Sequence, residues 1–213
     1  MTLILTAVCR DGIAICADKR RTLKTDKGSQ RFDDLHKIFR FSDSRTLAFN
    51  HAINRIVGTD WRTILTNFQE LISPGDFLCG ELADRFEKYL TDRVNQEINQ
   101  NRFDDSVGFV FCAVRPKREP EARELFWKRG RPIEIQSHRG LIRSGDGKKY
   151  LDDYISQNPR TNTVEYWQSL SVGEGTSKLC ELFAVASDAQ GCADGQEFST
   201  SYDTDTISMK ETA

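Results

Sequence analysis

The sequence lacks the short cysteine and histidine spacings that hold a metal ion. Its six cysteines include no Cys-x-x-Cys pair, and its three histidines stand far apart in the chain. Because structural metal sites draw ligands from such close spacings, we expect no metal site and no cofactor. Four cysteines have apolar neighbours, which predicts buried free thiols in a reducing compartment. These are Cys9, Cys16, Cys112 and Cys180.

Long apolar runs and an excess of one charge are also missing. No stretch approaches the roughly 18–20 apolar residues that span a bilayer, and no signal-peptide pattern opens the chain. The 30 Lys and Arg residues against 32 Asp and Glu residues leave a net charge of −2, which argues against a dedicated nucleic-acid binder. We therefore expect a cytoplasmic protein with no membrane and no nucleic-acid partner.

The first 22 residues carry the clearest local pattern. Leu3 to Cys9 is an apolar run, Asp11-Gly12 is a strong hairpin signal, and Ile13 to Ala17 is a second apolar run that ends at Asp18. Only Met1 precedes Thr2, so removal of Met1 would leave a threonine at the N-terminus. The pattern predicts two paired strands and a carboxylate at the end of the second.

An N-terminal threonine has chemical meaning. Its hydroxyl is a poor nucleophile until a base takes the proton. The α-amine of the same residue can be that base, because its unperturbed pKa of about 7.7–8.0 lies close to the operating pH. Nucleophile and base then belong to one residue, a known variant of the catalytic triad.

This opening resembles the N-terminal signature of proteasome β-type subunits and of bacterial HslV- or Anbu-like N-terminal-nucleophile hydrolases. An ordinary hairpin that opens an α/β domain is the alternative reading. The positions that match the signature at correct spacing are Thr2, Asp11, Gly12, Ala17, Asp18, Arg20 and Thr22.

The resemblance continues at Lys37. Residues 19–35 are charged and predict an extended loop, after which residues 36–41 alternate like a half-buried strand. Family members carry a catalytic lysine at the start of this strand, and Lys37 matches it. Its ammonium would favour the threonine alkoxide, and Asp18 would hold it charged and oriented. Taken alone, Lys37 fits a solvated lysine of an edge strand better, and it is Thr2 and Asp18 upstream that favour the catalytic reading.

Two positions depart from the family pattern. His51 falls in the slot of the usual oxyanion-hole glycine, where the donor is a backbone N–H that a non-glycine residue can also supply. A histidine packed in a turn is the alternative. Asp146, in Gly145-Asp146-Gly147, replaces the family's serine. Its carboxylate would bind the α-ammonium of Thr2 and raise the pKa of that amine, or it would cap the helix that follows.

Further along the chain the pattern predicts helices and strands in turn. Helices are expected over residues 54–72, 76–100, 148–157, 164–170 and 175–186, and strands over residues 106–115 and 122–128. Ile133 and Ile135 continue that sheet, and Leu141 and Ile142 are further candidates for it. The family ends its last helix with an aspartate that helps to order the nucleophile, and Asp188 matches it. Residues 197–213 are either an edge strand or a frayed tail.

The resemblance implies an α+β fold, the four-layer αββα sandwich of the N-terminal-nucleophile hydrolases with antiparallel sheets, as a single domain over residues 1–213. It implies a threonine peptidase in which Thr2 attacks peptide carbonyls, Asp18 and Lys37 tune it, and Arg20, His51, Asp146 and Asp188 support it. The implied partners are peptide or unfolded-protein substrates, further copies of the chain in a ring, and an ATP-dependent unfoldase. Two alternatives stay open: a transpeptidase that passes the acyl group to an amine, and a catalytically silent ring subunit.

Overall fold

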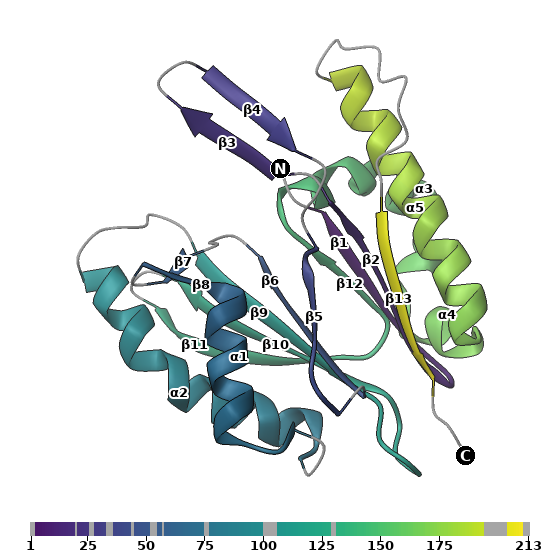
Figure 1. Ribbon diagram of the computed structural model, residues 1–213. Coiled ribbons are helices and arrows are strands. Elements are labelled where there is room, and N and C mark those ends of the chain that lie inside the picture. Colours follow the sequence, from purple (N-terminus) through teal and green to yellow (C-terminus); the bar gives the residue numbers. More distant parts are fainter. Residues whose placement is uncertain are drawn as a thin grey trace. The chain divides into compact units, whose positions relative to one another are not determined.

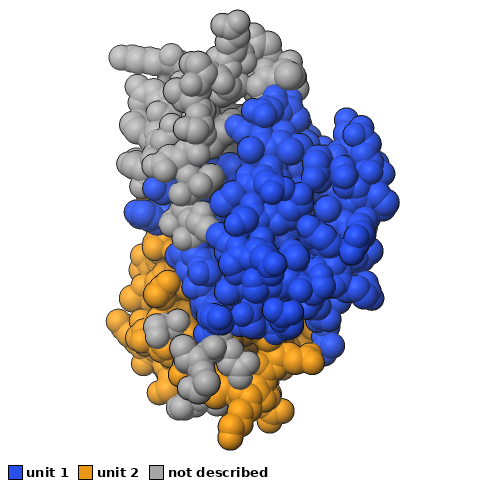
Figure 2. Space-filling view, turned by 90° about the vertical axis from the view of Figure 1, so that its right-hand side faces the viewer, with its two compact units in different colours: residues 1–37, 139–213 blue, residues 38–138 orange. Residues whose placement is uncertain are grey.

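The computed structural model describes residues 3–19, 21–25, 28–32, 36–43, 45–51, 55–56, 58–74, 77–99, 106–128, 131–193 and 204–210 (Figure 1). The chain forms two compact units, coloured separately in Figure 2. Unit 1 comprises Met1–Lys37 and Arg139–Ala213, and unit 2 comprises Ile38–His138. Each unit has its own sheet and its own hydrophobic core. The single domain expected over residues 1–213 stays a prediction.

Unit 1 has a four-stranded antiparallel sheet in the order β12-β1-β2-β13. Its strands are β1 (Ile4–Cys9), β2 (Gly12–Asp18), β12 (Leu141–Ser144) and β13 (Thr204–Lys210), so part of the C-terminal segment is an edge strand. A separate hairpin joins β3 (Arg21–Thr25) to β4 (Gly28–Phe32). The helices are η2 (Asp146–Leu151), α3 (Asp152–Gln157), η3 (Pro159–Asn162), α4 (Val164–Ser169) and α5 (Val172–Ala193).

Unit 2 has a five-stranded antiparallel sheet in the order β11-β10-β9-β6-β5. Its strands are β5 (Ile38–Arg40), β6 (Thr46–His51), β9 (Ser106–Ala113), β10 (Glu121–Lys128) and β11 (Arg131–His138). A short hairpin of β7 (Arg55–Ile56) and β8 (Thr59–Asp60) leads into α1 (Trp61–Leu71), which is followed by α2 (Cys79–Asn99). The prediction of an α+β fold with antiparallel sheets is confirmed.

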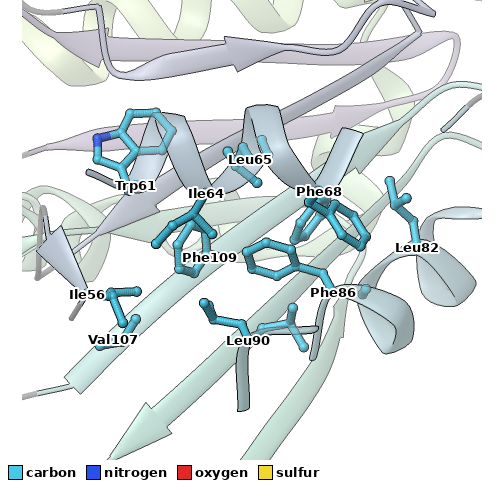
Figure 3. Packing of buried hydrophobic residues seen from close by; sticks show 14 of the residues in the cluster. Ile56, Trp61, Ile64, Leu65, Phe68, Leu82, Phe86, Leu90, Val107 and Phe109 are labelled. Atoms are coloured by element: carbon cyan, nitrogen blue, oxygen red, sulfur yellow. The ribbon is translucent and has the colours of Figure 1, made fainter. Parts of the chain in front are cut away.

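The core of unit 2 lies between its two helices and one face of its sheet (Figure 3). Phe86 of α2 makes edge-to-face ring contacts with Phe68 of α1 and with Phe109 and Phe111 of β9, at centroid separations of 5.0, 4.8 and 5.0 Å. Apolar residues at helical spacing on α2 supply this face, and every second residue of β9 meets it. These residues are core and leave the opposite face of the sheet for other contacts.

The turn between β1 and β2 fixes the start of unit 1. Asp11 Oδ1 accepts a hydrogen bond of 2.7 Å from the backbone N–H of Val172, the first residue of α5. A carboxylate at this position satisfies a free N–H and complements the helix dipole. Gly12 lies against β13, where an added Cβ would stand 2.1 Å from the carbonyl oxygen of Met209. The hairpin predicted from Asp11-Gly12 thus also positions α5 and β13.

Three expectations about secondary structure were wrong. Residues 19–35 were expected to form a loop, but β3 and β4 form a hairpin there. The helix expected from residue 54 begins at Trp61, because Gly58 has a φ of +73° and Asp60 caps the helix, its Oδ1 accepting the N–H of Arg62 at 2.9 Å. Leu141 and Ile142 belong to β12, which pairs with β1 and not with the sheet of unit 2.

The cysteines follow the prediction with one exception. The side chains of five of the six cysteines are described, and these five are free thiols. Four are buried, namely Cys9, Cys16, Cys79 and Cys112. Cys180, expected to be buried, is exposed on α5, because the apolar stripe of that helix passes through Leu179, Leu182 and Phe183 instead.

Candidate active site

Asp18 and Lys37 form a buried ion pair in unit 1. Lys37 Nζ lies 2.5 Å from Asp18 Oδ1, and the two side chains are 7% and 5% exposed. Asp18 is the last residue of β2, and Lys37 immediately precedes β5. Burial of two charges is costly unless each is paired and hydrogen-bonded, so this pair is a specific feature and not a solvated edge lysine.

The second oxygen of Asp18 holds the N-terminal strand. Asp18 Oδ2 accepts a hydrogen bond of 2.7 Å from the backbone N–H of Leu3, and the N–H of Asp18 donates to the carbonyl of Leu3 at 3.1 Å. Both carboxylate oxygens are therefore engaged, one by the lysine and one by the residue that follows Thr2 in the chain. Thr2 and Arg20 themselves lie outside the described residues.

The two supporting aspartates lie in different helical segments of unit 1. Asp146 begins η2 after Gly145, whose φ of +88° suits a glycine, and the side chain of Asp146 lies outside the described part. Asp188 is exposed on α5. The expectation that Asp188 ends this helix was wrong, because α5 continues to Ala193.

His51 is the last residue of β6 in unit 2, and not a residue of a turn as the alternative reading had it. Its Nε2 lies 2.8 Å from Glu124 Oε1, and His138 Nε2 lies 3.1 Å from Glu124 Oε2. One carboxylate on β10 thus joins histidines from the ends of β6 and β11. In the part of the chain that the structure describes, no group of three His, Cys, Asp or Glu residues is arranged to hold a metal ion.

Glu124 is held ionised by these contacts. Its burial by itself raises the pKa of the carboxyl, but hydrogen bonds from His138 and His51 outweigh that and lower the pKa to about 2. Sequence reasoning missed both Glu124 and His138. They stand 73 and 87 positions after His51 (124 − 51 and 138 − 51), so only the strand register could have revealed the cluster.

Three of the four buried thiols offer no competing nucleophile. Burial, with smaller contributions from Asp11 and Glu174, raises the pKa of Cys9 to about 12, and burial also raises the pKa of Cys79 and of Cys112 well above the ordinary value. Because the thiolate is the reactive form, these three cysteines are inert at neutral pH. None of the helices within the described ranges is long and apolar enough to cross a bilayer.

Comparison with known proteins bears on the fold of the chain. No family model and no curated protein matches the chain. Among solved structures, a Gly-1 mutant of Anbu from Hyphomicrobium sp. strain MC1 is 12% identical over 99% of this chain and 82% of that chain, with a TM-score of 0.61. The chain has an Anbu-like fold. Anbu (ancestral beta-subunit) from Yersinia bercovieri agrees, at 11% identity over 98% of this chain and 81% of that one, with a TM-score of 0.58.

The Anbu-like fold confirms the proteasome-like resemblance that was predicted from the first 22 residues. Both Anbu structures cover nearly the whole chain, so the likeness is not confined to the N-terminal hairpin. At 11–12% identity it concerns the fold alone, and the chemistry must be argued from the residues of this chain.

Proposed function

We propose that the chain is a threonine peptidase of the proteasome-like N-terminal-nucleophile type, with Thr2 as nucleophile once Met1 is removed. The observation that carries the proposal is the buried Asp18–Lys37 pair, whose carboxylate also binds the N–H of Leu3, the neighbour of Thr2. A buried lysine next to the residue that follows a candidate nucleophile is the arrangement that would lower the energy of its alkoxide.

In this proposal the Thr2 hydroxyl attacks a peptide carbonyl. The α-amine, through a water molecule, takes the hydroxyl proton as the Oγ–C bond forms, and passes a proton to the leaving amine as the C–N bond breaks. A water then hydrolyses the ester and restores the hydroxyl. Lys37 stabilises the developing alkoxide, and Asp18 orients Lys37.

The remaining roles follow from the resemblance and belong to the same proposal. Asp146 and Asp188 support the α-amine, and Arg20 supports the strand end after Asp18. The substrates are peptides or unfolded proteins. The protein assembles from further copies of itself into a ring, receives substrate from an ATP-dependent unfoldase, and acts in the cytoplasm.

Intact mass measurement tests the proposal directly. The purified protein is weighed before and after treatment with a β-lactone or an epoxyketone, which acylate or trap N-terminal threonines. For the wild type we expect loss of Met1 and one adduct per chain. The Thr2→Ala variant should form no adduct and cleave no peptide. A chain that keeps Met1 and forms no adduct with either reagent would contradict the proposal and favour the silent ring subunit.

The same preparation separates hydrolysis from transpeptidation. A peptide substrate is supplied with and without an added amine acceptor, and the products are weighed. Hydrolysis leaves a free carboxylate in both cases, whereas a transpeptidase yields the amide of the added amine as its main product.

A further inference from the structure

The hairpin of β3 and β4 concentrates positive charge in unit 1. Its two strands read RTLKT and GSQRF, so they hold three cations and no acidic residue. The cations are Arg21, Lys24 and Arg31. The whole chain has a net charge of −2, so the rest of it, without these three residues, carries −5 (−2 − 3). A cationic segment on an otherwise acidic chain is a local attraction for negatively charged ligands.

The two faces of the hairpin differ in charge. Directly paired residues of two strands share a face, and so do residues two positions apart along one strand. Lys24 pairs with Ser29, and Arg31 follows Ser29 by two positions, so Lys24 and Arg31 lie on the same face. Arg21, which pairs with Phe32, lies on the opposite face. We call the face with Lys24 and Arg31 the cationic face.

The hairpin is joined at both ends to the candidate active site. Lys24 follows Asp18 by six positions, and Arg31 precedes Lys37 by six (24 − 18 and 37 − 31). Because a chain spans at most about 3.6 Å per residue, each cation has its Cα within about 22 Å of that member of the ion pair. Figure 1 shows the hairpin extending beyond the end of β2, and it is not part of the four-stranded sheet.

The buried ion pair does not itself select substrates by charge. The ammonium of Lys37 is neutralised by Asp18 at 2.5 Å, and both side chains are buried. An extended peptide covers about 3.3 Å per residue, so six residues beyond the bond under attack span about 20 Å. That length matches the reach of Lys24 and Arg31 from the ion pair. Acidic residues within about six positions of the attacked bond therefore come within range of the cationic face.

We propose that the cationic face selects peptide substrates that carry Asp or Glu within about six positions of the bond that Thr2 attacks. This inference rests on the proposed function and names its substrate class. The attraction between the cations and the acidic peptide is electrostatic, so salt weakens it, and the preference is strongest at low ionic strength.

Peptide binding by Thr2→Ala tests the inference without catalysis. Three labelled peptides share one core and carry three Glu, three Gln or three Lys residues on both sides of it, and fluorescence anisotropy measures their dissociation constants. At low salt we expect the Glu peptide to bind about tenfold more tightly than the Lys peptide, or better. The difference should shrink several-fold at high salt, because the charges are then screened.

Charge variants locate the preference on the cationic face. In the Thr2→Ala background, Lys24→Gln with Arg31→Gln should bring the Glu and Lys peptides to within about twofold to threefold of each other. Lys24→Arg with Arg31→Lys keeps the charges and should keep the preference. Arg21→Gln is the matched control for Lys24→Gln, because it removes one charge from the opposite face of the same hairpin, and it should lower the preference less.

Kinetics carry the same test to the reaction. With Thr2 present, Lys24→Gln with Arg31→Gln should lower kcat/KM for the Glu peptide about fivefold or more. The value for the Gln peptide should stay within about twofold of the wild type, and so should the rate of adduct formation on Thr2.

The outcomes separate the two proposals. If the wild type forms no adduct on Thr2, the proposed function fails, whatever the peptides show. If the adduct forms, but Thr2→Ala binds the Glu and Lys peptides equally at low salt, only the inference about substrate charge is overturned. It is also overturned if Arg21→Gln lowers the preference as much as Lys24→Gln does. Tighter binding of a DNA oligonucleotide of the same charge than of the Glu peptide would overturn it in favour of a nucleic-acid ligand.

Discussion

At the scale of single residues, Asp18 and Lys37 show how a buried charge depends on its partner. Removing one partner takes the ion pair away from the other charge in a site that is about 5–7% exposed, and breaking a buried pair typically costs about 3–5 kcal/mol. We therefore expect Asp18→Asn and Lys37→Met each to lower the free energy of unfolding by about that amount in urea titrations.

The double variant is the informative comparison. Asp18→Asn with Lys37→Met leaves no buried charge, so its loss of stability should be clearly smaller than the sum of the two single losses. The single variants should also abolish adduct formation on Thr2, and the double variant should not recover it. Additive losses of stability would contradict the idea that the two charges act as one unit.

Glu124 makes the stability of the protein depend on acid. Its pKa is lowered from 4.5 to about 2 in the folded state, so its contribution is fully present above pH 4.5 and is lost as the pH falls through 2. The shift corresponds to about 3 kcal/mol at most. We expect the stability difference between the wild type and Glu124→Gln to fall by more than half between pH 6 and pH 3. Urea unfolding at several pH values measures it, and a constant difference would be the contrary result.

At the scale of elements, the β1–β2 hairpin illustrates a glycine that is required by its neighbour. Gly12 has no unusual φ, but a Cβ there would lie 2.1 Å from a backbone carbonyl of β13. Backbone atoms move less readily than a side chain, so Gly12→Ala should push β13 from the sheet. We expect the free energy of unfolding to fall by about 1–3 kcal/mol or more.

Gly173 supplies the control for that variant. It lies in the first turn of α5, and a Cβ there would meet nothing within 4 Å. Gly173→Ala should be neutral or slightly stabilising, because alanine favours the helix over glycine. Thermal unfolding of both variants checks the prediction. Equal midpoints for the two would show that β13 does not pack on Gly12 in solution.

Local signals account for the elements that the sequence predicted well. The hairpin at Asp11-Gly12, the apolar stripe of α2 and the runs of β9 and β10 each follow from neighbouring residues alone. The hairpin of β3 and β4 was missed, because its strands are charged and lack an apolar alternation. The start of α1 was placed too early, because Ile56 continues the helical stripe although it belongs to β7.

The residues of the candidate site also fall into those that local signals predict and those that they do not. Asp18 and Lys37 were predicted from a motif and lie together, 19 positions apart in the chain. Glu124 was not, since its contact with His51 depends on the register of β6, β9 and β10 and on the missing side chain of Gly108. A long-range side-chain contact of this kind cannot be derived from residue spacing. The position of Asp18, at a strand end that follows an N-terminal hairpin, can be.

At the scale of the whole molecule, the topology predicts an order of unfolding. Unit 2 is one continuous segment, but the sheet of unit 1 pairs β1 with β12, which lie on either side of it in the chain. Closing that sheet costs more entropy when residues 38–138 are an unfolded loop than when they are compact. Unit 1 should therefore not outlast unit 2 as denaturant rises.

Buried thiols report each unit separately. Cys9 and Cys16 are buried in unit 1, Cys79 and Cys112 in unit 2, and exposed Cys180 is a reference that reacts at once. After brief alkylation at increasing urea, peptide mass spectrometry should find Cys9 and Cys16 modified at the same urea concentration as Cys79 and Cys112, or at a lower one. A buried cysteine reacts only when its surroundings open. The reverse order would therefore mean that unit 1 keeps its sheet closed while unit 2 is unfolded, contrary to the loop-entropy argument.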